Sequence, residues 1–264
     1  MRARPARARG ALDALFQPLD TARQRRFYDA LGEGEERRGL WGLERRFSPQ
    51  SAVGSPSFRK WFTRLLEPIF ERHPRVLDVG CGPGIYFPLV APLCRSVTGA
   101  ELSARYARLA RDCAREYALP NVRMTVQDST RLAFPDRSFD AALCVDALHH
   151  VFDLERTLAE IARVVRPGGD VVIFEPNCLN PLLLLLCVFD RNEWGAVSRC
   201  WKGRYERLLA RHFEPVASAY NGLLIGPQGR LARGVADFLL EGPLAPALGR
   251  FSPEIFFHLR RRAA

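Results

Sequence analysis

Residues 76–84 read VLDVGCGPG, and this stretch decides the fold of the chain. It begins as a short β-prone run and enters a turn with G-x-G-x-G spacing, in which glycines permit positive φ angles and close approach of backbone to a ligand. A dinucleotide-binding loop usually has G-x-G-x-x-G spacing and places phosphate at a helix N-terminus. Here the third glycine comes one residue early and Asp78 precedes the loop, which disfavours phosphate and favours a positively charged ligand. The alternative is a tight turn without a ligand.

Outward from this stretch, short apolar runs alternate with helical patterns. The sequence predicts five strands, at residues 75–80, 96–101, 121–126, 139–145 and 170–174. It predicts helices from Ser103, as N-cap, to about Tyr117, and over 153–165, where the stop signal RPGG follows at 166–169. This alternation is typical of a parallel sheet covered on both faces, which binds ligands at the carboxyl ends of its strands.

Two more acidic residues follow strands of this predicted sheet. Glu101 ends the second strand, 21 residues after Gly80, where an acid commonly accepts hydrogen bonds from ribose hydroxyls. Asp128 follows the third strand, where a carboxylate can accept from an adenine amino group. The alternatives are a surface glutamate near a helix start and an ordinary aspartate in a turn.

Taken together, these residues resemble the class I S-adenosylmethionine-dependent methyltransferases, of the small-molecule, type 11-like kind. Residues 76–84 are similar to the family's first motif, 134–140 to its lead into strand four, and 164–169 to its turn before strand five. The resemblance covers about residues 75–176. It implies an α/β, Rossmann-like, doubly wound sheet of seven strands in the order 3-2-1-4-5-7-6, with the last strand antiparallel.

The resemblance also implies S-adenosylmethionine as cofactor and a set of binding residues. Asp78 and the loop amides would hold the amino-acid end, Glu101 the ribose and Asp128 the adenine. Tyr28 would belong to an N-terminal lid over the cofactor. The full set is Asp78, Gly80, Cys81, Gly82, Gly84, Glu101, Leu102, Asp128, Ser129, Asp146 and Tyr28.

The remaining segments complete the predicted organisation. Residues 1–74 are interpreted as an N-terminal tail and helical lid, with helices at 20–31 and 57–70. Residues 75–264 form the S-adenosylmethionine-binding domain, with strand six at 213–220 and strand seven at 254–260. Between these strands, a Gly- and Pro-rich insertion at 222–250, with an apolar helix at 231–240, is interpreted as a cap.

Three residues near the predicted acceptor side are candidates for catalysis. His149 and His150 follow strand four, and a histidine near neutral pKa can deprotonate a hydroxyl or an amine. Glu175 ends strand five and could orient a histidine or bind the acceptor. The alternatives are a structural histidine loop and an edge-of-pocket hydrogen bond.

The segment after Glu175 bears on the acceptor. The motif EPN at 175–177 with NP at 180–181 resembles a subset of small-molecule methyltransferases from bacterial biosynthetic and cell-envelope pathways. The apolar run 182–189 has three readings: a buried cap helix, a wall for a hydrophobic acceptor, or a peripheral membrane contact. It is far shorter than the roughly 20 residues that span a bilayer.

Composition narrows the classes of partner and compartment. The net charge is +10, yet the 39 basic residues include two lysines, Lys60 and Lys202, and therefore 37 arginines, often beside acids. This bias is typical of a GC-rich genome, and we do not expect a nucleic-acid partner. Seven widely spaced cysteines without a C-x-x-C pair indicate neither a zinc site nor a disulfide framework, and no metal is expected. The basic N-terminus lacks the apolar core of a secretory signal, which favours a cytoplasmic location. Whether this N-terminus is a targeting segment is left open.

The sequence therefore predicts an S-adenosylmethionine-dependent methyltransferase. It would transfer a methyl group to an O, N or C atom of a small, apolar or lipid-like biosynthetic metabolite. The alternatives are an RNA or protein methyltransferase and a non-catalytic partner subunit of the same fold. The Asn/Asp-Pro-Pro-Tyr type of signature common in nucleic-acid and protein amino-group methylases is replaced after strand four by residues 146–149, DALH. The acceptor and the oligomeric state are left open.

Overall fold

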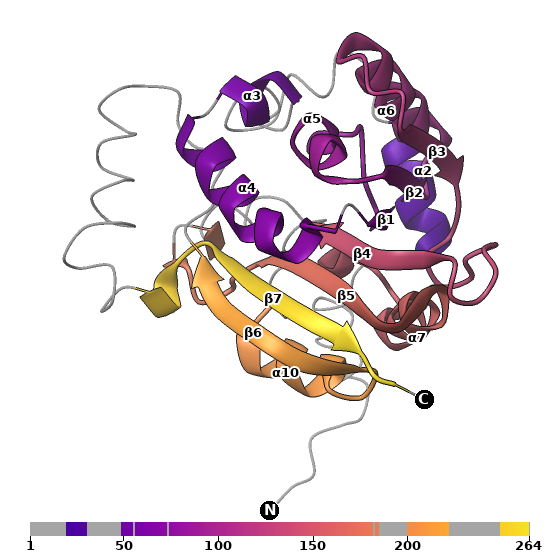
Figure 1. Ribbon diagram of the computed structural model, residues 1–264. Coiled ribbons are helices and arrows are strands. Elements are labelled where there is room, and N and C mark those ends of the chain that lie inside the picture. Colours follow the sequence, from indigo (N-terminus) through magenta and orange to yellow (C-terminus); the bar gives the residue numbers. More distant parts are fainter. Residues whose placement is uncertain are drawn as a thin grey trace, which may run out of the picture.

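The computed structural model describes residues 20–30, 49–54, 56–72, 74–181, 183–184, 200–221 and 249–263. At its centre lies a seven-stranded sheet in the order β3-β2-β1-β4-β5-β7-β6, which confirms the predicted α/β, Rossmann-like topology (Figure 1). Its strands are β1 (Arg75–Val79), β2 (Ser96–Glu101), β3 (Val122–Val126), β4 (Phe139–Val145), β5 (Val165–Pro176), β6 (Phe213–Asn221) and β7 (Glu254–Arg261). The helices of four residues or more are α2 (Thr21–Ala30), α3 (Pro49–Gly54), α4 (Pro56–Phe70), α5 (Phe87–Val90), α6 (Ala104–Glu116), α7 (Leu154–Val164) and α10 (Lys202–Leu209).

Strand direction follows the prediction as well. The pairs β3-β2, β2-β1, β1-β4 and β4-β5 are parallel, whereas β7 runs antiparallel to both β5 and β6. Because β7 is antiparallel, it begins at the edge where β1 to β5 end, and Glu254 lies opposite Pro176. Residues from the start of β7 therefore join the carboxyl edge of the sheet.

Two apolar layers sandwich the sheet. On one face, Phe62 and Leu66 of α4 pack with Val76, Leu143 and the β5–β7 aromatic residues. The opposite face is covered by α7 and α10 through a second cluster that includes Leu158, Ile161, Tyr205 and Leu209. Figure 1 shows α4 on one side of the sheet and α7 and α10 on the other. Burial on both faces explains why the central strands read as continuous apolar runs.

The start of β5 differs from the prediction. The RPGG sequence at 166–169 does end helix α7 at Val164, but β5 begins at once with Val165 instead of at Asp170. Val165 pairs with Phe139 and Asp170 pairs with Ala141, so the strand pair carries an irregularity. Gly168, at φ 71°, accommodates the extra residues between Val165 and Asp170. The sequence signal that ends the helix does not reveal that Val165 already pairs with β4.

The N-terminal segments are only partly described. Helices α2 and α4 confirm the helices predicted at 20–31 and 57–70, while α3 was not predicted. The predicted cap helix at 231–240 and most of the run 182–189 lie outside the described residues. The division at residue 74 stays a prediction. None of the helices in the described ranges has the length and apolar character that crossing a membrane requires.

Candidate active site

A row of acidic residues marks the carboxyl edge of the sheet. Six adjacent strands each carry one acid at this edge or directly after it. In sheet order these are Asp128 after β3, Glu101 on β2, Asp78 on β1, Asp146 after β4, Glu175 on β5 and Glu254 on β7. We call the β3-β2-β1 part the glycine-loop half and the β4-β5-β7 part the histidine half.

The glycine loop places bare backbone beside this row. Gly80 and Gly82 have φ angles of 71° and 54°, which L side chains rarely adopt. A Cβ on Gly80 would lie 2.6 Å from the Cβ of Ala147, so the loop packs closely on the segment after β4. A Cβ on Gly82 would meet nothing within 4 Å. The backbone at Gly82 therefore borders open space in the described structure, into which a ligand can approach.

Glu101 joins the loop to the start of helix α6. Its Oε2 accepts a hydrogen bond from the Gly82 amide and its Oε1 accepts one from the Ser103 amide, both at 2.9 Å. Ser103 in turn caps α6, accepting from the Tyr106 amide. Burial raises the pKa of Glu101, and the amides oppose that rise. Each carboxylate oxygen has a further lone pair with which it can accept from a vicinal diol.

Asp78 is the least satisfied acid of the glycine-loop half. Its side chain points from β1 to the face that carries Val76, it is 3% exposed, and no hydrogen-bond donor reaches it from the described part of the chain. Burial, reinforced by the charge of Glu101, raises its pKa to about 7. Since buried polar groups normally have partners, this carboxylate is suited to a cationic ligand.

The side chains of Asp128 and Ser129, neighbours in one turn, have different partners. Oδ1 of Asp128 accepts from the amide and the hydroxyl of Thr130, at 2.9 and 2.7 Å, and no donor in the described ranges occupies Oδ2. The Ser129 hydroxyl lies 3.0 Å from that of Thr157 on α7. Asp128 is therefore able to accept from a ligand, whereas the Ser129 side chain is engaged with α7.

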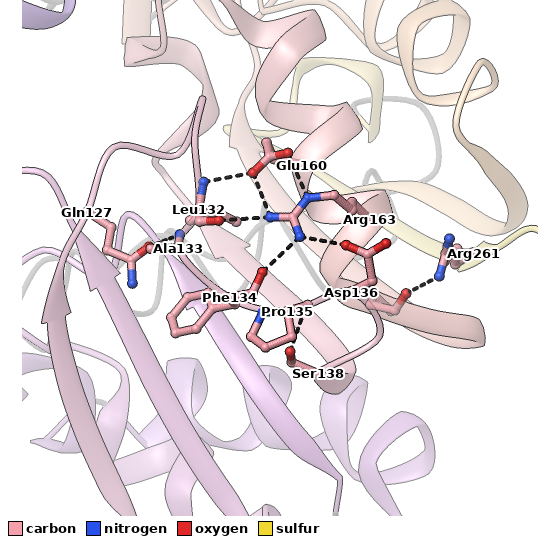
Figure 2. Close-up of polar contacts among 11 residues, drawn as sticks. Gln127, Leu132, Ala133, Phe134, Pro135, Asp136, Ser138, Glu160, Arg163 and Arg261 are labelled. Carbon is pink, nitrogen blue, oxygen red and sulfur yellow. Dashed lines mark hydrogen bonds and ion pairs between the residues drawn. The ribbon is translucent and has the colours of Figure 1, made fainter.

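Arg163 of α7 fixes the segment that follows Asp128. Its guanidinium donates to the carbonyls of Leu132 and Phe134 and to the carboxylates of Glu160 and Asp136, at 2.7–2.9 Å (Figure 2). Glu160 also accepts from the Leu132 amide. The β3–β4 connection is thus held on α7 by charge-assisted hydrogen bonds.

The other loop residues of the predicted set are structural neighbours of these groups. Cys81 is buried, with its Sγ 3.8 Å from the Sδ of Met124. The Gly84 amide donates to the Cys81 carbonyl, and its own carbonyl accepts from the Cys113 thiol. Leu102 is half-buried between Glu101 and Ser103. The Cys81 side chain and the Gly84 backbone thus support the loop.

Asp146 opens the histidine half. It takes a positive φ of 50°, and its amide donates to the Phe174 carbonyl of β5. Its Oδ2 accepts from the Tyr86 hydroxyl at 3.3 Å, and the Tyr86 ring stacks on Phe62 with 5.3 Å between centroids. Burial raises the pKa of Asp146 to about 6. Tyr86, two residues after the glycine loop, was not predicted as a site residue, because nothing in the local pattern links it to Asp146.

Glu175 is fully buried beneath the two histidines. Its carboxylate accepts five hydrogen bonds, from the amides of Ala147, Leu148 and His149, from His149 Nδ1 and from the Tyr205 hydroxyl, at 2.7–3.1 Å. It therefore fixes the turn that carries the histidines. Of the two roles considered for Glu175, orienting a histidine fits this geometry and direct contact with an acceptor does not.

His150 lies on the outer side of the same turn and meets the N-terminal helix. Its ring is 4.0 Å from that of His149 and 6.0 Å from that of Tyr28 on α2, between centroids. Burial and the neighbouring His149 lower its pKa, so the ring is neutral at neutral pH. Tyr28 also contacts Tyr106, and Asp29 accepts from the Ser103 hydroxyl at 2.6 Å. Helix α2 thus links the start of α6 to His150.

The chain is similar in sequence to known methyltransferases. Residues 77–173 match the family model described as a methyltransferase domain. The chain is 40% identical over 100 residues to a demethylmenaquinone methyltransferase of Tropheryma whipplei (strain Twist), covering 38% of this chain and 41% of that protein. It is 35% identical over 160 residues to a ubiquinone biosynthesis O-methyltransferase of Paracidovorax citrulli, covering 60% of this chain and 66% of that protein.

Among solved structures, the fold is similar to that of the PH0226 protein from Pyrococcus horikoshii, with a TM-score of 0.58 and 20% identity over 88% of this chain and all of that one. The chain spans between 41% and 66% of the length of the curated relatives compared here. The fold, the glycine loop and the family match together define a class I methyltransferase domain. Residues 77–173 of this chain match that family.

Proposed function

We propose that the chain transfers a methyl group from S-adenosylmethionine to an O, N or C atom of a small, apolar or lipid-like metabolite. The observation that carries this proposal is the acidic row beside the open glycine loop, in a chain whose net charge is +10. A ligand with two positive groups, an ammonium and a sulfonium, suits such an edge, whereas a dinucleotide pyrophosphate does not.

The residues of the glycine-loop half fit this cofactor. Asp78, to which no described residue donates, suits the ammonium end, and the open backbone at Gly82 allows a close approach. Both oxygens of Glu101 are oriented by amides and keep lone pairs for ribose hydroxyls. Oδ2 of Asp128 is available for an adenine amino group. Tyr28 would cover the bound molecule from α2.

When bound, the cofactor supplies a methyl group on sulfonium, which leaves by in-line displacement, so alignment and exclusion of water are the main tasks of the protein. Where the acceptor must lose a proton, His150 is a candidate base, because burial keeps its ring neutral and able to accept one. His149 and Glu175 would hold His150 in place through the turn.

The relatives named for demethylmenaquinone and for ubiquinone biosynthesis support an apolar acceptor. A cytoplasmic location and a peripheral membrane contact stay predictions, since the run 182–189 lies mostly outside the described residues.

Calorimetric titration with S-adenosylmethionine tests the proposal, using wild type, Asp78→Asn and Asp112→Asn. Asp112 is an exposed acid on α6, paired with Arg115, and serves as the matched control. We expect micromolar binding in wild type and in Asp112→Asn, and a loss of at least about ten-fold in Asp78→Asn, because the carboxylate charge that faces the ammonium is removed. No binding by the wild type, or equal binding by all three, would contradict the assignment.

A further inference from the structure

Glu254 is a buried acid that the sequence did not single out. It begins β7 at the carboxyl edge and is 8% exposed. Among the described residues, no donor forms a hydrogen bond or an ion pair with its carboxylate. Glutamate is rarely buried without a partner, because the desolvation of the charged form is then uncompensated. A buried acid without a described partner, beside a candidate active site, is a candidate for binding a ligand.

Two asparagines hold the chain in front of Glu254. The Asn177 side chain donates to the carbonyls of Arg250 and Ser252, at 2.9 and 2.7 Å. The Asn180 side chain donates to the Phe251 carbonyl at 2.7 Å. These are the asparagines of the EPN and NP motifs, so the motifs clamp the entry to β7 against the end of β5. The clamp fixes Glu254 at the edge although its carboxylate accepts no hydrogen bond from the described residues.

The surroundings of Glu254 are acidic and aromatic. Strand alternation places it on the face of Phe256, whose ring packs 5.1 Å from that of Phe174. Burial and the charges of Asp146 and Glu175 raise its pKa. Its charge also acts on Tyr86, which donates to Asp146. Within the described structure no arginine or lysine balances this group of acids. Protonation of one acid, or a cation bound between them, relieves the repulsion between Asp146 and Glu254, and His149 offsets part of it at Asp146.

We propose that Glu254 and Asp146 bind a protonated amino group on the methyl acceptor, which is then an apolar amine. This inference rests on the proposed methyl transfer and deepens it. Glu254 is suitably placed for an acceptor site. In the order of the sheet it lies beyond β4 and β5, away from Glu101 and Asp128, the residues proposed to hold the cofactor. An ammonium between two carboxylates gains charge-assisted hydrogen bonds, and the aromatic rings of Phe174 and Phe256 suit the apolar part.

The test compares octylamine with 1-octanol, two probes of similar shape that differ in charge. Each is titrated calorimetrically into protein saturated with S-adenosylhomocysteine. In wild type we expect octylamine to bind at least about ten-fold more tightly than octanol. In Glu254→Gln this preference should disappear, while S-adenosylhomocysteine still binds as in wild type. Glu214→Gln, at an exposed position on β6, should keep the preference.

Equal binding of the two probes by wild type would overturn the inference, and this comparison does not depend on any variant folding. A preference that survives in Glu254→Gln would overturn it too. The binding of S-adenosylhomocysteine by wild type is measured first and separately. If it fails while the amine preference still depends on Glu254, the amine site stands and the proposed methyl transfer falls.

Discussion

The two halves of the carboxyl edge are built in different ways. In the glycine-loop half, acids are held by amides nearer in sequence: Glu101 by Ser103 and Gly82, two and 19 residues away, and Asp128 by Thr130, two residues away. In the histidine half, partners are distant. Tyr86 and Asp146 are 60 residues apart, Tyr205 and Glu175 are 30 apart, and Asn177 and Ser252 are 75 apart.

This difference separates a site that a local motif can encode from one that exists only after the sheet has assembled. Glu175 and Glu254 make the contrast sharpest, because both are buried at neighbouring strands of the histidine half. Glu175 accepts five hydrogen bonds, whereas Glu254 accepts none from the described residues. One acid stabilises the fold, and the other is held in place by the fold.

The largest effect is expected at Glu175. Replacement with Ala leaves three amides, a histidine and a tyrosine hydroxyl without their acceptor, and should lower the free energy of unfolding by about 3–5 kcal/mol. Urea denaturation followed by circular dichroism measures this, with Glu214→Ala at an exposed position on β6 as control. A loss below about 1 kcal/mol would show that the turn does not depend on this carboxylate.

The next effect is a pH dependence at Asp78. Its pKa rises from the ordinary value of 3.8 to about 7 on folding, so the folded chain holds this proton after the unfolded chain has released it. The contribution to the free energy of unfolding is therefore largest below about pH 4 and falls as the pH rises toward 7, by at most about 4 kcal/mol.

The measurement is the free energy of unfolding of wild type and Asp78→Asn at intervals from acid to neutral pH, without ligand. The variant lacks this titration, so its stability relative to wild type should increase as the pH rises. Parallel profiles would mean that Asp78 has an ordinary pKa and that the glycine-loop half is already satisfied.

A smaller loss of stability is expected on replacing Arg163, the residue through which the glycine-loop half depends on contacts distant in sequence. Arg163→Ala removes bonds to two carbonyls and two carboxylates and should cost about 2 kcal/mol. It should also weaken S-adenosylmethionine binding, because the segment after Asp128 loses its anchor. Thermal unfolding and calorimetry test both effects against Arg111→Ala, an exposed control on α6. Unchanged binding would show that the position of Asp128 depends on its local turn and not on Arg163.

The smallest effect on stability is expected at Glu254. Because no hydrogen bond or ion pair in the described structure is lost, Glu254→Gln should change the free energy of unfolding by no more than about 0.5 kcal/mol, or raise it. Urea denaturation beside Glu175→Gln gives the direct comparison. Equal destabilisation by the two variants would remove the distinction between these acids.

Much of the fold was predictable because the signals are local. The strands around residues 75–145, the N-cap at Ser103 and the order of the sheet follow from apolar runs, turns and family motifs, and the structure confirms them. The start of β5 at Val165 was missed, since Pro and Gly at 167–169 normally end a strand. Helix α3 was missed as well, because a six-residue helix leaves little periodicity.

For the candidate site, the sequence by itself determined the glycine-loop half: Asp78, the glycines, Glu101 and Asp128 occur at spacings set by one strand, one turn and the next strand. In the histidine half the sequence named Asp146, His149, His150 and Glu175, but only the tertiary structure decided their contacts. It placed Tyr86 beside Asp146, put Glu175 under the histidines and left Glu254 buried without a partner among the described residues. The physical reason is that backbone geometry relates residues within a turn, whereas contacts between distant strands form only when burial of their apolar faces closes the sheet.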